Sequence, residues 1–446
     1  MHYLLKEVFY IYETRTNTDY IKYCFMKKIA IFLIGLAAAW LLPAKGQIVS
    51  ENDTLPQGVY SDEQISEILR NMPNIEVGKG LTFKTKDDKY KLTLRLRMQS
   101  LAGITLNDQF SVTQTEACIK RLRLRFDGHV FSPKLTYSIQ LGFSPYDAKL
   151  LGNGNMNIIR DAMVYYVPSA NWNIGFGQTK IRGNRARINS SSALQFVDRS
   201  IVNSEFNLDR DFGLFGEYYN HIGKTFQYAV KASITTGDGR NFRLSTNSGL
   251  AYTARVELFP LGRFKALGDV TEGDFEREET PKLMIAGAYS YNDRAARIQG
   301  ENGDEFIDGN RRSLQSYFVD FIFKYNGFAF YTDFMGRICD KPLIYRDGFV
   351  EQNVYTGMGL NVQASYIFPK NWEIAARHST LMPEAQVRPY VGYKTYNQAT
   401  LGVTKYIIGH TLKVQADISY NYATEAIPAV FQYDRWQARI QIEVGI

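Results

Sequence analysis

Residues 90–99 have the sequence YKLTLRLRMQ, in which apolar and polar residues alternate at every position. A β-strand points successive side chains to opposite faces, so this segment has one apolar face and one cationic face. The apolar face carries Tyr90, Leu92, Leu94, Leu96 and Met98. The opposite face carries Lys91, Thr93, Arg95, Arg97 and Gln99.

The same period of two recurs along the chain. Arg121, Arg123 and Arg125 alternate with leucines and Phe126, and the pattern returns at 135–143 and 436–446. A soluble sandwich would show this alternation too. Here, however, the segments are about ten residues or longer, which is the length a tilted strand needs to cross a bilayer. Short and long connections also take turns, and aromatic residues gather at strand ends, as at Tyr165-Tyr166. These features predict an all-β protein, a transmembrane antiparallel β-barrel.

The pattern predicts about sixteen strands, and an even number returns both chain ends to the periplasm. We expect them near 89–100, 117–130, 135–144, 157–167, 171–180, 211–220, 225–235, 250–259, 282–291, 314–325, 328–337, 354–367, 372–379, 395–407, 411–421 and 433–446. A further short strand at 81–86 makes eighteen the alternative count. A barrel of this size encloses an aqueous lumen, which favours a channel.

The overall composition excludes several other classes of protein. Of the 446 residues, 14% are aromatic, which gives too much apolar surface for a disordered chain. Mean hydropathy is −0.27 and there is only one long apolar run, so a bundle of membrane helices is excluded. The net charge of +7 does not indicate nucleic-acid binding, because the cations follow strand spacing toward the lumen. The three cysteines form no CxxC pair, so we expect no metal site and no cofactor. We expect Cys118 and Cys339 to be unpaired, with one disulfide between them as the alternative.

The N-terminal region has the features of an export signal. Lys27 and Lys28 precede the apolar run 29–42, and small residues follow up to Gly46. This order is typical of a cleaved secretory signal peptide at 26–46, with an uncleaved anchor as the alternative. We interpret residues 1–25 as an over-extended start, 47–80 as a periplasmic segment with a short helix, and 81–446 as the outer-membrane barrel.

The long connection 181–210 contains both charged and apolar residues. Its apolar anchors, among them Leu194, Phe196 and Val197, need a packing partner, and the barrel interior is the nearest one. We therefore expect this loop to fold inward and narrow the pore. The charged constriction residues predicted here are Asp198, Arg199 and Arg210.

The predicted lumen-facing cations suggest selection of anions, because rings of arginine and lysine favour anions and guanidinium groups suit phosphate oxygens. The predicted pore-lining residues are Lys91, Arg95, Arg97, Arg121, Arg123, Arg125, Lys180, Arg182, Arg185 and Arg187. In the alternative interpretation these arginines pair with nearby carboxylates, such as Asp127 and Asp161, and line a general pore. A catalytic role is disfavoured, because no histidine lies near a plausible Ser-Asp pair in the sequence.

Several motifs of the chain resemble the phosphate-selective porin O and P family, in the branch common in Bacteroidetes-type bacteria. They are Gly177-Gln178-Thr179-Lys180, Gly183-Asn184-Arg185, Leu194-Gln195-Phe196-Val197-Asp198-Arg199-Ser200, Asp209-Arg210-Asp211-Phe212-Gly213 and Thr236-Gly237-Asp238-Gly239-Arg240-Asn241. The resemblance implies a homotrimeric sixteen-strand porin in the outer-membrane lipid, with an inward third loop, that passes small anions such as phosphate.

We therefore expect a passive diffusion channel for anions, with three alternatives. One is a general porin for small polar solutes. Another is a structural barrel of a secretion machine, for which the long connection 260–281 would offer a docking surface. The third, a barrel enzyme, is disfavoured above.

Overall fold

The computed structural model describes residues 74–76, 79–147, 149–150, 156–241, 244, 249–432 and 434–446. The predicted start, signal peptide and short helix lie outside these residues. The chain divides into two units, and the larger one, Pro73–Thr105 with Thr113–Ile446, is the barrel. Leu106–Val112 belongs to the other unit and forms a turn, in which the Asn107 side chain accepts hydrogen bonds from the backbone of Gln109 and Ser111.

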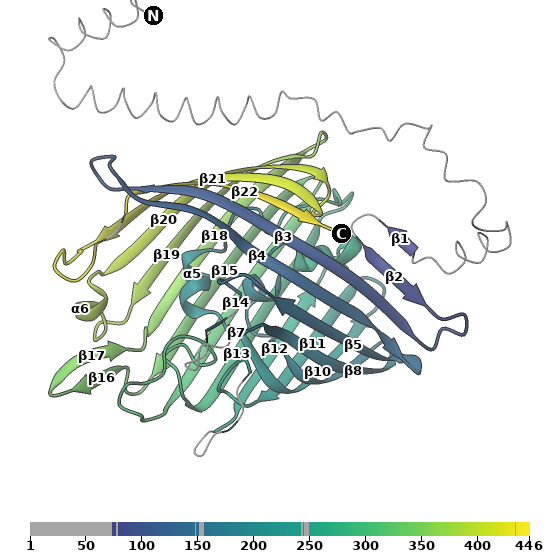
Figure 1. Ribbon diagram of the computed structural model, residues 1–446, viewed down its shortest axis with the longest axis horizontal. Helices are drawn as coiled ribbons and strands as arrows, with labels where there is room; N and C mark the ends of the chain where they lie inside the picture. Colours follow the sequence, from purple (N-terminus) through teal and green to yellow (C-terminus); the bar gives the residue numbers. More distant parts are fainter. Residues whose placement is uncertain are drawn as a thin grey trace, which may run out of the picture. The chain divides into compact units, whose positions relative to one another are not determined.

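Sixteen antiparallel strands form a closed barrel (Figure 1). They are β3 (Lys91–Leu106), β4 (Val112–Val130), β5 (Ser132–Gly142), β8 (Ile159–Ser169), β9 (Trp172–Lys180), β10 (Arg210–Ile222), β11 (Phe226–Thr235), β12 (Ala251–Phe259), β13 (Lys282–Ala295), β14 (Arg312–Tyr325), β15 (Phe328–Cys339), β18 (Gly357–Phe368), β19 (Trp372–Pro383), β20 (Thr395–Ile408), β21 (Leu412–Thr424) and β22 (Trp436–Gly445). Each predicted strand is present, so the count of sixteen is confirmed.

The barrel closes where β22 meets β3. The backbone N–H of Ile446 donates to the carbonyl of Leu96, at 3.0 Å. The N-terminal part of β3 pairs instead with β2 (Gly80–Lys84), in which Leu81 lies opposite Leu94. β2 itself pairs with β1 (Asn74–Glu76). The predicted extra strand at 81–86 therefore exists, but it extends the edge at the seam and is not a member of the ring.

The remaining elements lie in the connections between barrel strands. They are β6 (Lys149–Leu150), β7 (Met156–Asn157), β16 (Leu343–Arg346), β17 (Phe349–Asn353), α4 (Arg185–Ile188), α5 (Ile201–Phe206), α6 (Arg388–Val391) and the 3₁₀ segment η1 (Lys265–Val270). No helix among the described residues is long and apolar enough to cross a bilayer.

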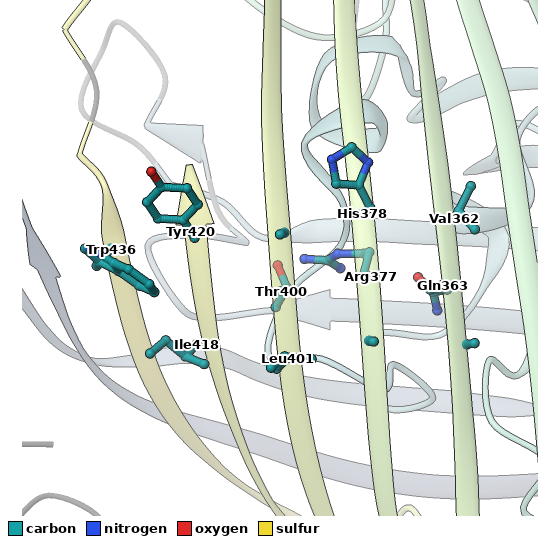
Figure 2. A pocket seen from close by; sticks show the side chains of 12 residues that line it. Val362, Gln363, Arg377, His378, Thr400, Leu401, Ile418, Tyr420 and Trp436 are labelled. Carbon is teal, nitrogen blue, oxygen red and sulfur yellow. The ribbon is translucent and has the colours of Figure 1, made fainter. Parts of the chain in front are cut away.

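The outer wall carries aromatic residues near both rims. Trp172 and Tyr218 contact each other at the rim that carries the C-terminus, with ring centroids 4.8 Å apart. Tyr420 and Trp436 do so near the opposite rim, at 4.7 Å. Figure 2 shows these two rings on neighbouring strands, beside a groove of about 450 Å³ with Leu401 and Ile418 among its lining residues. Such belts are typical of the two membrane interfaces.

Inside the barrel, the core forms between the inward loop and the wall. The main apolar cluster joins residues of the connection 181–209 to residues of β12–β15, β19 and the connection after β12. In Figure 1, α5 lies within the ring of strands, and its contacts are with β15, β18 and β19. The lumen is therefore filled along this part of the wall.

Candidate permeation site

The connection 181–209, here called the constriction loop, crosses the lumen from β9 to the far wall. The Gln195 amide donates to Glu373 on β19 at 2.8 Å, and the Val197 backbone donates to Asp417 on β21 at 3.0 Å. The Leu194 carbonyl accepts from Lys413 on β21 at 3.1 Å. The predicted inward-folded loop is thus confirmed, and polar groups of the opposite wall fix its position.

Glycines of the barrel wall make room for the apolar anchors of this loop. Phe196 and Val202 are both buried. A Cβ atom added at Gly402 on β20 would lie 2.8 Å from the Phe196 ring, and one added at Gly359 on β18 would lie 2.9 Å from Val202. These two positions accept the loop only because they carry no side chain.

Most of the predicted cations on β4 hold loops in place. Arg123 forms a bidentate pair with Asp147 at 2.6 Å and also donates to Ser191 of the constriction loop at 2.9 Å. Arg121 contacts Asp198 of the same loop at 3.3 Å. Both arginines are buried. Its burial and its partners assign Arg121 to loop attachment, which corrects its predicted contact with the anion. Arg123 attaches the loops as well, but it also lines the small cavity described below, so its contact with a solute stays a prediction.

The cations of the constriction loop and its ends are mostly attached to protein groups as well. Lys180, Arg185 and Arg199 donate to loop or turn carbonyls, whereas Arg182, Arg187 and Arg210 pair with Glu217, Asp209 and Asp161. Arg185 and Arg210 are only 2% and 1% exposed, so their predicted solute contact is corrected in the same way. Asp198 accepts from Lys120 at 2.6 Å, and it therefore joins the loop to β4.

Three of the predicted arginines, Arg95, Arg97 and Arg125, meet water at one cavity, and the side chains of Arg182 and Arg187 are also 21% and 19% exposed. The side chains of Arg95 and Arg125 are 43% and 44% exposed, and they share the carboxylate of Asp127 at 2.9 and 2.8 Å. Arg97 lies 3.7 Å from Glu443 and donates to two serines of the constriction loop. With Arg123 behind them, they line a cavity of about 190 Å³. Lys91 lies at the first position of β3 and is half-buried.

Cations outnumber carboxylates along this part of the wall. Four carboxylates are each shared by two cations, as follows: Asp127 by Arg95 and Arg125, Asp147 by Arg123 and Arg160, Asp198 by Lys120 and Arg121, and Asp209 by Arg187 and Arg210. Arg210 also contacts a fifth carboxylate, Asp161. Eight cations thus meet five carboxylates in this set. At the cavity itself, the four arginines Arg95, Arg97, Arg123 and Arg125 meet the three carboxylates Asp127, Asp147 and Glu443, which leaves one positive charge in excess.

Some residues of this network could not be found from the sequence. Lys120 and Arg121 are consecutive and both buried, whereas the preceding Ile119 is 47% exposed. This break in the alternation is typical of a β-bulge, which a strict period of two misses. Asp147 and Arg160 come from a loop and a strand that no local pattern links to β4.

The pKa of Asp147 predicts how the conductance of the channel depends on pH in acidic solution. Burial raises the pKa of this carboxyl, but the paired Arg123 and Arg160 lower it further, from 3.8 to about 2. A carboxylate with a lowered pKa stabilises the fold above its ordinary pKa and loses this effect as pH falls through the lowered value. We therefore expect the difference in single-channel conductance between the wild type and Asp147→Asn to stay constant from pH 7 to about pH 4 and to disappear between about pH 4 and pH 2.

The same measurement on Asp147→Asn provides the comparison. This variant lacks the charge at every pH, so its conductance at pH 7 should already resemble that of the wild type in acid. If wild type and variant titrate alike, Asp147 does not couple the loops to β4.

A closed sixteen-strand barrel with a polar, loop-narrowed lumen defines an outer-membrane channel of the porin class. Porins are channels and not enzymes, so a catalytic function does not apply here. Residues 92–260 match the family model described as phosphate-selective porin O and P. This match confirms the resemblance predicted from the sequence motifs.

Comparisons with solved structures agree on the fold. The chain is similar to the outer membrane channel DcaP of Acinetobacter baumannii, with a TM-score of 0.51 and 14% identity over 82% of this chain and 100% of that one. It is also similar to OmpF of Salmonella typhi, solved with daunomycin, with a TM-score of 0.52 and 14% identity over the same shares. At this identity the likeness concerns the fold alone. A comparison with curated protein sequences gave no match.

Proposed function

We propose that this channel is a passive diffusion pore that prefers small anions, phosphate among them. The observation that carries the proposal is the sharing of carboxylates, in which Asp127 is divided between the two water-exposed arginines Arg95 and Arg125. An anion entering the cavity meets guanidinium donors that one carboxylate neutralises only in part. These donors replace part of its hydration shell weakly enough for it to leave again.

The family description supports phosphate as a solute, since guanidinium groups bind phosphate oxygens in a bidentate manner. We expect phosphate added to a chloride solution to reduce the chloride current through single channels in planar bilayers, because a bound phosphate excludes chloride from the cavity. Sulfate, which has a similar shape, serves as the comparison anion. A chloride current that is unaffected by phosphate would remove phosphate from the proposal and leave the general anion preference to be tested separately.

One observation favours a second candidate, a general porin for small polar solutes. Each water-exposed arginine of the cavity has a carboxylate within 4 Å, Arg97 included. If these carboxylates neutralised the positive electrostatic potential of the arginines, the channel would pass cations and anions alike. The secretion-machine alternative rests only on the connection 260–281, whose acidic residues Glu272 and Asp274 are buried while Leu261 and Leu267 are 41% and 70% exposed.

We further propose that the mature chain is exported through a cleaved signal peptide at 26–46 and forms a homotrimer in outer-membrane lipid, as the resemblance implies. Mass determination of the detergent-solubilised channel tests the trimer, and N-terminal sequencing of the mature protein tests the cleavage.

A further inference from the structure

The connection between β12 and β13 is unusually long for its end of the barrel, and it folds back into the lumen. Its segment 264–278, here called the clamp, includes η1. Asp269, Glu272, Asp274 and Glu278 of the clamp are at most 7% exposed. A connection that projected into the periplasm would leave carboxylates in water, because burying an unpaired charge is costly. Glu278 accepts from the backbone of Lys265 and Asp269 lies 4.0 Å from Arg263, so these two find partners within the connection. Glu272, Asp274 and the backbone carbonyls of the clamp find partners in the rest of the barrel.

One set of partners belongs to the barrel wall. The buried ammonium group of Lys324 on β14 donates to the carbonyls of Gly268 and Gly273, both at 2.7 Å, and also to Thr271. Asp274 accepts from the backbone of Gly327, at 2.7 Å. Four acceptors around one buried ammonium group fix the path of the clamp against the wall.

The other set of partners belongs to the constriction loop. Arg185 donates to the carbonyl of Asp269 at 2.7 Å and to that of Thr271 at 2.5 Å. The backbone of Glu272 donates to Ala193 at 3.3 Å, and its carboxylate accepts from the backbone of Gln195 at 2.9 Å. The clamp thus holds the loop at two places, next to α4 and at 193–195.

We propose that the clamp is a second constriction element, which positions the constriction loop from the periplasmic side and thereby sets the width of the pore. Arg185 and Glu272 are its positioning residues, since they connect the two connections and do not face the solute. The inference rests on channel activity and is independent of anion preference. Pore width is measured by conductance and solute size, whereas preference is measured by reversal potential, so the two claims fail separately.

The first test shortens the connection. Phe259 and Lys282 end and begin neighbouring paired strands, and continuing their register places position 262 opposite position 281. A tight Asn-Gly turn in place of 263–280 can therefore join them. Lys324→Met is combined with it, because the shortened chain would otherwise leave a buried ammonium group without acceptors. We expect single-channel conductance to rise by about twofold, with faster entry of larger sugars into liposomes, since a wider pore excludes less.

The matched control shortens the exposed tip 345–350 of the extracellular β16–β17 hairpin, which among the described residues forms no hydrogen bond to the constriction loop. Conductance of this control should equal that of the wild type. Both variants are first shown to be folded by their heat-dependent mobility in gels. A folded clamp deletion with wild-type conductance and sugar entry would overturn the proposal.

A second variant covers the case in which the deletion does not fold. Ala193→Cys with Glu272→Cys, in a background with Cys118 and Cys339 replaced by serine, places two thiols where the two backbones are already hydrogen-bonded. The oxidised protein should keep the wild-type conductance, and reduction should raise it, because the Glu272 carboxylate no longer holds Gln195. Equal conductance before and after reduction, with the disulfide shown by mass, would contradict the proposal.

Discussion

Arg95→Gln combined with Arg125→Gln should make the channel lose its anion preference, although the barrel and its constriction loop stay in place. These two side chains reach water, and neither supports the loop. Their removal leaves Asp127 unpaired, so the local charge changes from positive to negative. If each removed charge changes the relative free energy of an anion and a cation in the cavity by about one kT, two charges change it by about two kT. The ratio of anion to cation permeability should therefore fall roughly sevenfold. Reversal potentials in a potassium chloride gradient give this ratio.

The converse change provides the sharpest comparison. Asp127→Asn removes the shared carboxylate and should raise anion preference. As a matched control, Lys224→Gln with Lys370→Gln removes two cations from exposed turns between strands and should leave the ratio unchanged. If the control lowers the ratio as much as the two arginine substitutions do, total charge governs selectivity and the cavity does not.

The second large effect is expected from Gly402→Val on β20. The new side chain would occupy the place of the Phe196 ring, whose nearest atom lies 2.8 Å from the added Cβ. Overpacking of this kind destabilises the packed state by about 1–3 kcal/mol. The constriction loop can relieve this strain by moving away from β20, while the pairing of the barrel strands persists. We therefore expect a larger and noisier single-channel conductance together with a loss of discrimination between sugars by size.

Gly216→Val on β10 is the matched control, because a Cβ atom added there has no neighbour within 4 Å. It should behave like the wild type in both conductance and sugar uptake. An unchanged conductance in folded Gly402→Val would show that Phe196 does not hold the loop in its narrowing position.

The sequence predicted the barrel well, because the face of a strand follows from local alternation. The apolar face of 90–99 lies outward and the cationic face inward, as Leu96 and Gln99 illustrate. The inward loop was also predictable, since anchors such as Phe196 have no place in water. Both inferences need only neighbouring residues and the requirement to bury apolar side chains.

The partners of the charged residues could not be predicted, because they join segments that are far apart in the chain. Arg123 and Asp147 lie 24 positions apart, and Arg185 and Asp269 lie 84 positions apart. Alternation places Arg123 and Arg125 on the same face, but only their partners distinguish a loop support from a group that meets the solute. The role of the connection 260–281 was hidden for the same reason, since its acidic residues look like those of a solvated loop.

We propose that the net positive charge around the cavity of Arg95, Arg97 and Arg125 makes this an anion-preferring channel. The reversal potential of the wild-type channel in a potassium chloride gradient tests it most directly, because potassium and chloride have similar mobilities in water. We predict a potential with the sign of chloride permeation. A potential with the sign of potassium permeation would contradict the account.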